Sequence, residues 1–319
     1  MVTLVIPCYN EEAVLPDTLT RLLGWRHDMV VRQRIDPASR LVFVDDGSRD
    51  RTWSLLAEAA GAHREVAAIR LSRNRGHQNA LLAGLSVAEG DALVSIDADL
   101  QDDINAIDRM IERYEAGFDT VYGVRRSRGT DTAYKRLTAA AFYRLMRALG
   151  TDTVAEHADF RLLSRRAVEA LKTYREVHLF LRGLVPLIGY PSCIVHYDRK
   201  PRAAGESKYP TRRMLEFALD AVTSFSAFPL RMISMLGFSV FTGTLLLAVW
   251  VLWVRFVLDA SVPGWASILL PLSFLGGLQL LALGVIGEYL GKLYLEAKGR
   301  PRYFIEDMLD GDSLRPPPE

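Results

Sequence analysis

Two long stretches in the last third of the chain contain no charged residue. Residues 232–254 span 23 positions, and residues 260–287 span 28 positions, without Asp, Glu, Lys or Arg. About 20 apolar residues are enough for a helix to cross the hydrocarbon core of a bilayer, and amphipathic helices of soluble domains rarely stay uncharged for so long. The sequence therefore predicts two transmembrane helices, at about 232–254 and 264–287, within a membrane region at residues 230–290.

Basic residues flank this region on both sides. They precede the first span or follow the second: Arg212, Arg213, Arg231, Lys292, Lys298, Arg300 and Arg302. The short connection between the spans has only Arg255 at its edge. Because Lys and Arg are enriched in cytoplasmic loops, we expect both termini of this multi-pass chain to be cytoplasmic.

The segments on either side of the membrane region have different patterns. Residues 211–229 place apolar side chains at helical spacing, which predicts an amphipathic helix. This helix lies either in the membrane interface or on the soluble part of the chain. Residues 291–319 are expected to form a cytoplasmic C-terminal segment that ends in a disordered tail, GDSLRPPPE.

The first 210 residues alternate between strand-like and helix-like patterns. Apolar runs predict strands at 4–7, 41–44, 66–71, 92–96 and 120–123. The stretches between them predict helices at 11–23, 51–60, 77–88 and 104–116. Regular β-α alternation implies an α/β domain at residues 1–210 with a Rossmann-like, mainly parallel sheet.

Composition excludes several other classes of protein. The formal net charge of +1 lacks the basic excess that nucleic-acid binding requires. Cys8 and Cys193 are isolated, so they predict neither a disulfide framework nor a zinc site. The six histidines show no metal-ligand pairing, and we interpret each as an ordinary core or solvent-facing imidazole.

Two carboxylates follow the fourth predicted strand in the segment SIDADLQDD, residues 95–103. Asp97 and Asp99 are spaced i, i+2 at the carboxyl end of the strand, where α/β sheets bind their ligands. Mg²⁺ and Mn²⁺ prefer such oxygen ligands, and substrate phosphates often complete the Mg²⁺ shell. A polar strand end with a helix-capping Asp has the same pattern, so neighbouring motifs must decide between the two interpretations.

The first two predicted strands also end in polar residues. Tyr9 can present an aromatic face to a base, and Glu11 can either cap the following helix or accept a hydrogen bond from a nucleotide. Asp45 and Asp46 offer acceptors for a pyrimidine N–H or for ribose hydroxyls. Each motif alone is also a common turn or cap. Their convergence with Asp97 at one sheet edge favours a site for a nucleotide diphosphate.

These motifs together resemble a known family. VIPCYNEE, FVDDGSRDRT, NRGHQNALLAGLSVAEGD and SIDADLQDD are similar to successive blocks of family 2 glycosyltransferases with the GT-A fold. VYGVRRSR, ADFRLLSRRAV and RKPRAAGESKYPTRRM resemble the narrower group of polyprenyl-phosphate glycosyltransferases. That group includes dolichol-phosphate mannose synthases and bacterial undecaprenyl-phosphate glucosyltransferases. The resemblance runs from residue 3 to about residue 300 and implies a protein of the bacterial inner (plasma) membrane.

The resemblance implies roles for the matching residues. Nucleotide binding falls to Pro7, Tyr9, Glu11, Asp45, Asp46 and Asp97. The resemblance assigns metal binding to Asp97, Asp99 and Gln101, and catalysis to Asp99 and Asp159. Binding of the donor and acceptor phosphates falls to Arg125, Arg126, Arg161, Arg202, Ser207 and Lys208. Asp159 serves as a base or positions the acceptor.

The chain departs from the family pattern at two points. Asp102, Asp103 and Ile104 stand where the family often has Asp-Pro-Pro, and Asp103 can replace the prolines as a helix cap. His157 and Ala158 stand where a glycine often precedes the acidic residue.

We therefore expect an inverting transferase, dependent on Mg²⁺ or Mn²⁺, that moves a hexose from a nucleotide diphosphate sugar to undecaprenyl (polyprenyl) phosphate. UDP-glucose is the first candidate donor, and the product is a lipid-linked phosphosugar on the cytoplasmic face. Expected partners are these two substrates, the membrane and a second copy of the chain, but no nucleic acid. A processive polysaccharide synthase is one alternative, although it normally needs more spans and a QxxRW motif. A non-catalytic nucleotide-sugar-binding membrane scaffold is the other, and it does not need the whole set of acidic and basic residues.

Overall fold

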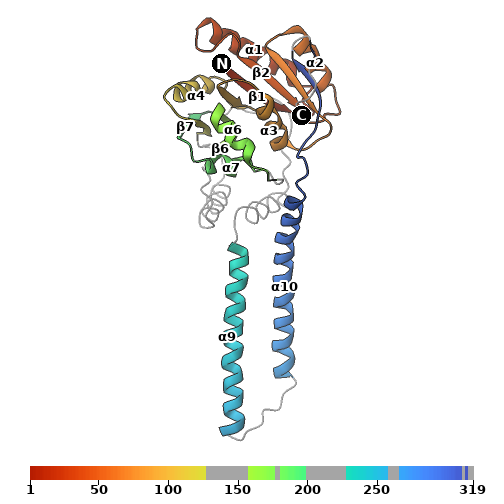
Figure 1. Ribbon diagram of the computed structural model, residues 1–319, viewed down its shortest axis with the longest axis vertical. Coiled ribbons are helices and arrows are strands. Elements are labelled where there is room, and N and C mark those ends of the chain that lie inside the picture. The colour runs from red at the N-terminus through yellow and green to blue at the C-terminus, as the bar shows by residue number, and fades with distance from the viewer. Residues whose placement is uncertain (127–156, 177–179, 199–227, 258–265, 311–312, 315–319) are drawn as a thin grey trace. The chain divides into compact units, whose positions relative to one another are not determined.

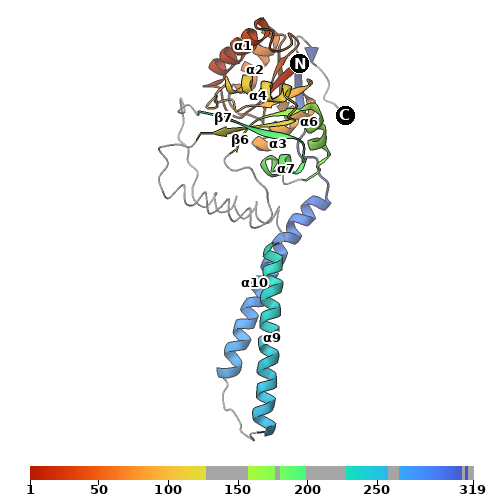
Figure 2. The ribbon, with the colours of Figure 1, turned by 90° about the vertical axis from the view of Figure 1, so that its left-hand side faces the viewer.

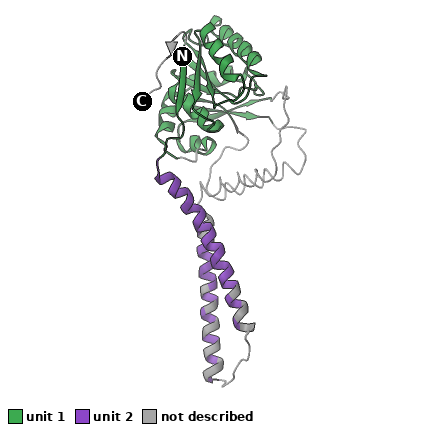
Figure 3. Ribbon diagram, turned by 90° about the vertical axis from the view of Figure 1, so that its right-hand side faces the viewer, with its two compact units in different colours: residues 1–147, 152–208, 300–319 green, residues 148–151, 209–299 purple. Residues whose placement is uncertain are grey.

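A computed structural model describes the chain except for residues 127–156, 177–179, 199–227, 258–265, 311–312 and 315–319. The chain forms two compact units, coloured separately in Figure 3. The first comprises residues 1–147, 152–208 and 300–319, and it contains a sheet with its covering helices. The second comprises residues 148–151 and 209–299, and it contains two long helices.

Nine strands form the sheet of the first unit within the described residues (Figure 1). They are β1 (Val2–Cys8), β2 (Arg40–Asp45), β3 (Val66–Leu71), β4 (Ala92–Ser95), β5 (Thr120–Arg125), β6 (His157–Ser164), β7 (Ser192–Tyr197), β8 (Ile305–Asp310) and β9 (Ser313–Leu314). Their order across the sheet is β7-β5-β6-β4-β1-β2-β3-β8-β9.

The α/β class is confirmed, but the sheet is mixed rather than mainly parallel. Neighbours among β1 to β4 pair in parallel, as the β-α alternation predicts, and β5 pairs in parallel with β7. However, β6 runs antiparallel between β4 and β5, and β8 runs antiparallel to β3. Local patterns predict strands but not their partners, and these antiparallel pairings join segments that are far apart in the sequence.

Helices cover both faces of this sheet (Figure 2). The helices of the first unit are α1 (Leu15–Val31), α2 (Thr52–Ala62), α3 (His77–Val87), α4 (Ala106–Glu115), α6 (Arg165–Thr173) and α7 (Leu181–Leu187). Helices α1, α2 and α4 share a buried apolar core with alternate residues of the strands, such as Leu4 and Ile6 of β1. Helices α3 and α6 pack on the opposite face. The first helix begins later than predicted, because a loop with Asn10 in the left-handed region precedes it.

Helix α3 approaches the sheet unusually closely. A Cβ atom added at Gly84 would lie 2.4 Å from Val5 Cγ1 and 2.7 Å from Val44 Cγ2. The backbone of α3 therefore rests directly on β1 and β2, which only glycine permits at this position. Helix α3 begins at His77, which follows β3.

The second unit contains α9 (Phe228–Val257) and α10 (Ala266–Ala297), which contact each other. α9 includes the first predicted span, and α10 includes residues 266–287 of the second. Residues 264–265 and most of the segment predicted as an amphipathic helix, 211–227, lie outside the described residues. Large apolar side chains remain exposed along both helices, including Met235, Phe238, Leu246, Ile268, Leu272 and Leu280. Within the described residues, Phe274–Ala297 is the segment long and apolar enough to cross a membrane by itself.

The chain after α10 returns to the sheet of the first unit. Strand β8 pairs with β3, and β9 pairs with β8. Asp310 of β8 forms an ion pair with Arg40 of β2. The sequence did not predict these two strands. Of the tail expected to be disordered, residues 311–319, the described part is Ser313–Leu314 in β9.

Candidate active site

The loops after β1 and β2 are tied together at the carboxyl edge of the sheet. The Asn10 N–H donates to Ser48 Oγ at 2.9 Å, and the Arg49 N–H donates to Asn10 Oδ1 at 2.9 Å. Closer to the strands, the Asp46 N–H donates to the Cys8 carbonyl at 2.9 Å. Asn10 has a φ of 55°, a conformation that Asn tolerates better than most residues. The structure therefore brings the first two motifs side by side.

The predicted nucleotide ligands on the first loop differ in exposure. Pro7 is buried in β1, whereas the Tyr9 side chain is exposed and can meet a ligand face. The Glu11 N–H donates to Thr52 Oγ1 at 2.9 Å at the start of α2, so this residue joins the two loops. The loop thus exposes the Tyr9 ring, and hydrogen bonds hold the loop in place.

Asp45 and Asp46 have different roles in the structure, although burial raises the pKa of both. Asp46 accepts from the Arg75 and Gly76 N–H groups at 2.7 and 2.8 Å, so it holds the loop before α3. Asp45 Oδ1 accepts from the Ser48 N–H at 3.1 Å. Among the described residues, Asp45 Oδ2 has no hydrogen-bond donor. Arg70 Nε lies 3.8 Å from this oxygen, and the Asp45 side chain is fully buried, so it faces Arg70 rather than solvent.

The segment after β4 forms a tight turn. The Leu100 N–H donates to the Asp97 carbonyl at 3.2 Å, and the Gln101 N–H donates to Asp99 Oδ1 at 3.2 Å. Leu100 is buried with a φ of 44°, a left-handed conformation that costs of order 1–3 kcal/mol in a non-glycine residue. Thr18 of α1 stabilises the turn by donating its hydroxyl to the Ala98 carbonyl at 2.6 Å. A strained backbone at Leu100 is therefore part of the turn that holds Asp97 and Asp99 in this arrangement.

Asp97 lies in a cluster of negative charge. Burial raises its pKa to about 6, with further increases from Asp102, Asp159 and Asp99, while His77 opposes them. The side chain is nevertheless 38% exposed, so a ligand can reach it from solvent. A carboxylate that is crowded by other carboxylates and open to solvent suits a divalent cation.

The described side chains do not form a complete cation site. In the described part of the chain, no group of three or more His, Cys, Asp or Glu side chains has the arrangement of a metal site. Asp97 and Asp99 both retain some exposure, whereas Gln101 is almost fully buried. This fits a magnesium-type site, in which one or two carboxylates bind the ion and substrate phosphates and water complete the shell.

Asp159 of β6 is surrounded by positive charge instead. Its carboxylate accepts from Arg161 Nη2 at 2.6 Å and from Arg182 Nη2 and Nε at 3.0 and 3.3 Å. Burial alone would raise the pKa of Asp159, but Arg161 and Arg182 outweigh it and hold the pKa at about 2. Asp159 is therefore ionised at neutral pH.

His77, at the start of α3, joins these two carboxylates. Its Nε2 atom lies 3.5 Å from Asp97 Oδ1 and 3.6 Å from Asp159 Oδ2. No sequence pattern indicated a role for His77 or Arg182. The only sequence signal for His77 was its place after the third strand, at the same sheet edge as the other motifs. For Arg182 there was none.

Arg125 contacts a different carboxylate. Its Nη2 and Nε atoms donate to Asp102 Oδ1 at 3.3 Å and to the Tyr197 hydroxyl at 3.1 Å. That hydroxyl donates to Asp102 Oδ1 at 2.5 Å. Arg125 thus stabilises the turn that carries Asp97 and Asp99.

The other predicted phosphate ligands are dispersed. Arg126 lies on the surface, with its Nη1 atom 3.6 Å from Asp198 Oδ2. Arg161 is buried beside Asp159. Arg202, Ser207 and Lys208 lie outside the described residues.

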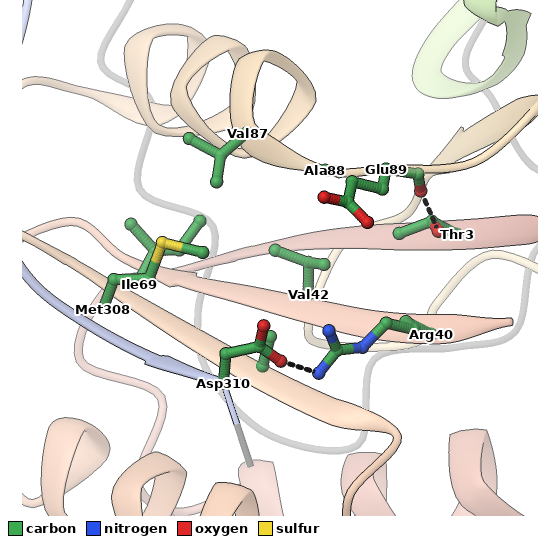
Figure 4. Close-up of a pocket in the computed structure, with 10 residues that line it drawn as sticks. Thr3, Arg40, Val42, Ile69, Val87, Ala88, Glu89, Met308 and Asp310 are labelled. Atoms are coloured by element: carbon green, nitrogen blue, oxygen red, sulfur yellow. Dashed lines mark hydrogen bonds and ion pairs between the residues drawn. The ribbon is translucent and has the colours of Figure 1, made fainter. Parts of the chain in front are cut away.

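A cavity of about 210 Å³ lies elsewhere in the same unit (Figure 4). Thr3 and Arg40, near the starts of β1 and β2, line it together with Val87 at the end of α3 and with Met308 and Asp310 of β8. These positions are at the amino ends of the parallel strands. The cavity is therefore separate from the carboxylate site at the opposite edge.

Comparisons with known proteins identify the family. Residues 3–172 match the family described as Glycosyl transferase family 2. The uncharacterized glycosyltransferase YkoT of Bacillus subtilis is 46% identical over 318 residues, which cover 99% of this chain and 94% of that protein. The bactoprenol glucosyl transferase of Shigella phage SfX is 39% identical and covers 96% of this chain and 98% of its own length. The chain therefore belongs to glycosyltransferase family 2.

The narrower resemblance, to the polyprenyl-phosphate glycosyltransferases of that family, is confirmed by the relatives named bactoprenol glucosyl transferase. The family match and the mixed α/β sheet also agree with the expected GT-A-like fold. Among solved structures, glucosyl-3-phosphoglycerate synthase from Mycobacterium tuberculosis is similar with a TM-score of 0.44 and 17% identity. This similarity covers 70% of this chain and 76% of that one.

Proposed function

We propose that this glycosyltransferase moves a hexose from a nucleotide diphosphate sugar, with UDP-glucose as the first candidate, to polyprenyl phosphate. The observation that carries the proposal is the pair of adjacent, oppositely charged environments around Asp97 and Asp159, joined by His77. One suits a cation with a diphosphate, and the other suits an anionic acceptor. Relatives named bactoprenol glucosyl transferase support a polyprenyl acceptor and glucose.

On the donor side, Asp97 and Asp99 would hold Mg²⁺ or Mn²⁺, whereas Gln101, also predicted as a ligand, is almost fully buried on the same turn. When bound, such an ion neutralises charge on the departing diphosphate. Tyr9 offers its exposed ring to the base, and the buried Asp45 lies at the end of β2 on the same side of the sheet. Asp46 positions the loop before α3, and with it His77, rather than binding the nucleotide itself.

On the acceptor side, Asp159 positions the acceptor and is not a general base. Its pKa of about 2 makes it a weak proton acceptor. The acceptor also needs little help, because a phosphate monoester has a second pKa near 6 and is mostly dianionic at neutral pH. An acceptor oxygen attacks the anomeric carbon, the bond to the diphosphate breaks, and the configuration inverts.

The two long helices support a membrane location for this chemistry. Apolar side chains on α9 and α10 remain exposed along their length, a surface that lipid would cover. Basic residues flank both helices, which supports cytoplasmic termini and a cytoplasmic active site. We therefore propose a catalytic domain at residues 1–210, an interfacial segment at 211–229, a two-helix membrane hairpin within 230–290 and a cytoplasmic segment at 291–319 that adds β8 and β9 to the sheet of the catalytic domain.

The decisive experiment is product analysis with the purified full-length protein. Undecaprenyl phosphate is supplied with UDP-glucose, UDP-galactose, UDP-N-acetylglucosamine or GDP-mannose, each with and without a chelator. A lipid-linked monosaccharide that forms only with divalent metal supports the proposal and identifies the sugar. A polymer would indicate a processive synthase instead, and absence of any product with all four donors would favour a binding scaffold.

A further inference from the structure

We propose that His77 is a catalytic residue whose Nε2–H donates a hydrogen bond to the departing diphosphate of the sugar donor. This inference rests on the proposed function and deepens it, because it names a side chain of α3 that takes part in the transfer. The ligand class is a nucleoside diphosphate with its divalent cation.

The first observation is the position of His77 between the two carboxylates of the site. Its Nε2 atom is 3.5 Å from Asp97 Oδ1 and 3.6 Å from Asp159 Oδ2. The His77 side chain is also 41% exposed, so a ligand can reach it from solvent. One ring nitrogen therefore borders both the donor side and the acceptor side.

The neighbours of Nε2 determine where the ring proton lies. An ionised carboxylate only accepts hydrogen bonds, and Arg161 and Arg182 keep Asp159 ionised by lowering its pKa to about 2. Nε2 therefore carries the proton and is a donor. Both of its contacts are longer than the usual N–H···O hydrogen bond of about 2.9 Å. A closer acceptor that enters the site would therefore compete successfully for this N–H.

The backbone that carries His77 is fixed on both sides. The preceding residue, Gly76, donates its N–H to Asp46 Oδ2 at 2.8 Å. The following residue, Gln78, accepts at its Oε1 atom from the Leu181 N–H at 2.8 Å. The imidazole is thus attached to a segment that is held from the loop after β2 and from the start of α7. A donor that is positioned in advance needs no reorganisation when charge develops during a reaction.

The two carboxylates differ in their other partners. Asp159 accepts from Arg161 Nη2 at 2.6 Å and from Arg182 Nη2 at 3.0 Å. Among the described side chains, the one that pairs with the Asp97 carboxylate is His77. A cation bound by Asp97 would take over this pairing, and the diphosphate oxygens that share the cation lie beside the same carboxylate. The Nε2–H therefore serves these oxygens, whereas guanidiniums already serve Asp159.

The role of His77 is to stabilise charge, and it transfers no proton. An oxygen of the acceptor phosphate gives an electron pair to the anomeric carbon. The bond from that carbon to the β-phosphate oxygen breaks, and its electron pair stays on this oxygen. Negative charge on the diphosphate rises during the step, so a hydrogen bond from His77 is stronger in the transition state than in the ground state. Removal of one such donor typically lowers kcat by a factor of about 100 to 1,000.

The kinetic test compares His77→Ala, His77→Gln and His77→Asn in the full-length protein with a matched control, His63→Ala. His63 is an exposed histidine that follows α2, before the amino end of β3. For His77→Ala we expect kcat to fall about 100-fold, while the KM for undecaprenyl phosphate changes less than about twofold. His77→Gln places an amide N–H close to the position of Nε2 and should recover at least about tenfold in kcat. The shorter His77→Asn should not, and the control should change neither constant.

A binding measurement that needs no turnover separates this inference from the proposed function. Calorimetry in the presence of Mn²⁺ compares UDP with UMP, and GDP with GMP, in the wild type and in each variant. For His77→Ala we expect the affinity for the diphosphate to fall about 10- to 100-fold, the effect of losing a charge-assisted hydrogen bond, while the affinity for the monophosphate is unchanged. This result supports the inference even if the wild type transfers no sugar to undecaprenyl phosphate and the proposed function fails.

Three results would overturn the assignment of His77. The first is equal diphosphate affinity in the wild type and His77→Ala. The second is an equal loss of diphosphate and monophosphate affinity with a lowered Tm, which would show a structural role. The third is equal kcat in His77→Gln and His77→Asn, which would show that the position of the donor does not matter.

Discussion

Asp97 and Asp159 both lie near the same ring nitrogen of His77, yet their charge environments are opposite. His77 Nε2 is 3.5 Å from one carboxylate and 3.6 Å from the other. Burial and neighbouring carboxylates raise the pKa of Asp97 to about 6. Two arginines overcome burial and lower the pKa of Asp159 to about 2. Two carboxylates of the same residue type thus acquire different chemistry from their neighbours alone.

The difference indicates what each carboxylate still needs. The Asp97 cluster has an excess of negative charge, and a cation would relieve it. Asp159 is already compensated by Arg161 and Arg182, so it needs no ligand and is a poor base. We therefore propose that Asp97 belongs to a binding site that becomes complete with substrate, whereas Asp159 belongs to a site that is organised in advance.

The largest effect is expected from Asp99→Ala. If Asp99 binds the cation, its removal should lower turnover at least about 1,000-fold, because the metal supplies several kcal/mol of charge stabilisation. The fold should persist, since Asp99 is on a partly exposed turn. Asp103→Asn, in the same segment, is the matched control. Near-normal turnover of Asp99→Ala with unchanged dependence on added Mg²⁺ or Mn²⁺ would refute the donor half of the comparison.

Asp159→Asn should affect stability as well as activity. The substitution leaves the guanidiniums of Arg161 and Arg182 without their carboxylate, and Arg161 is buried. Loss of one partner of a buried ion pair costs about 3 kcal/mol or more of unfolding free energy. Turnover should fall, while affinity for the nucleotide sugar stays the same. Denaturant unfolding in detergent and donor calorimetry measure the two effects. Asp119→Asn is the control. The partner of Asp119, Arg166, is exposed, and loss of the Asp119 charge should not change turnover. Loss of donor binding in Asp159→Asn would move this residue to the nucleotide side.

The pH dependence of stability tests the sign of the Asp159 shift. Folding lowers its pKa from the ordinary value of 3.8 to about 2. The stability from this lowered pKa is fully present above pH 4 and is lost as the pH falls through the window from about 4 to about 2. This pKa shift contributes about 2 kcal/mol to the free energy of unfolding above the window. The difference in unfolding free energy between wild type and Asp159→Asn should therefore shrink by that amount across the window. A constant difference would show that the arginines do not lower this pKa.

Much of the donor side was predictable from the sequence, because it depends on local patterns. Each strand that leads into Asp45 or Asp97 is a short apolar run followed by polar residues, and parallel strands gather their carboxyl ends at one edge. The structure confirms the α/β class and brings these loops to one edge. The sequence did not indicate that Asp46 uses both oxygens to hold the backbone before α3.

The acceptor side was less predictable, because it depends on contacts between distant segments. Strand β6 carries Asp159 antiparallel between β4 and β5, a pairing that no local pattern indicates. His77 reaches Asp97 because Gly84 lets α3 rest on the sheet, and Arg182 reaches Asp159 from a helix with no recognisable motif. A single His or Arg in a sequence is uninformative until the fold provides its neighbours.

The smallest expected effect, from Asp97→Asn, is also the sharpest test of the comparison, because its sign is opposite to that of Asp159→Asn. A raised pKa means that the folded protein holds the Asp97 carboxylate at a disadvantage, so stability falls as the pH rises from about 4 through about 6. Replacing the carboxylate by a neutral amide removes this disadvantage. The side chain is 38% exposed, and solvent screening limits the gain to below about 1 kcal/mol.

We therefore expect metal-free Asp97→Asn to unfold at a slightly higher temperature than the wild type at pH 7.5, with no difference at pH 4. Added Mn²⁺ should narrow the gap at pH 7.5, because the cation stabilises only the protein that has both carboxylates. Asp103→Asn controls for loss of negative charge in the same segment. If metal-free Asp97→Asn is less stable than the wild type at pH 7.5, neighbouring groups stabilise the negative charge of Asp97 as the arginines stabilise that of Asp159. The proposed difference between the two carboxylates would then be wrong.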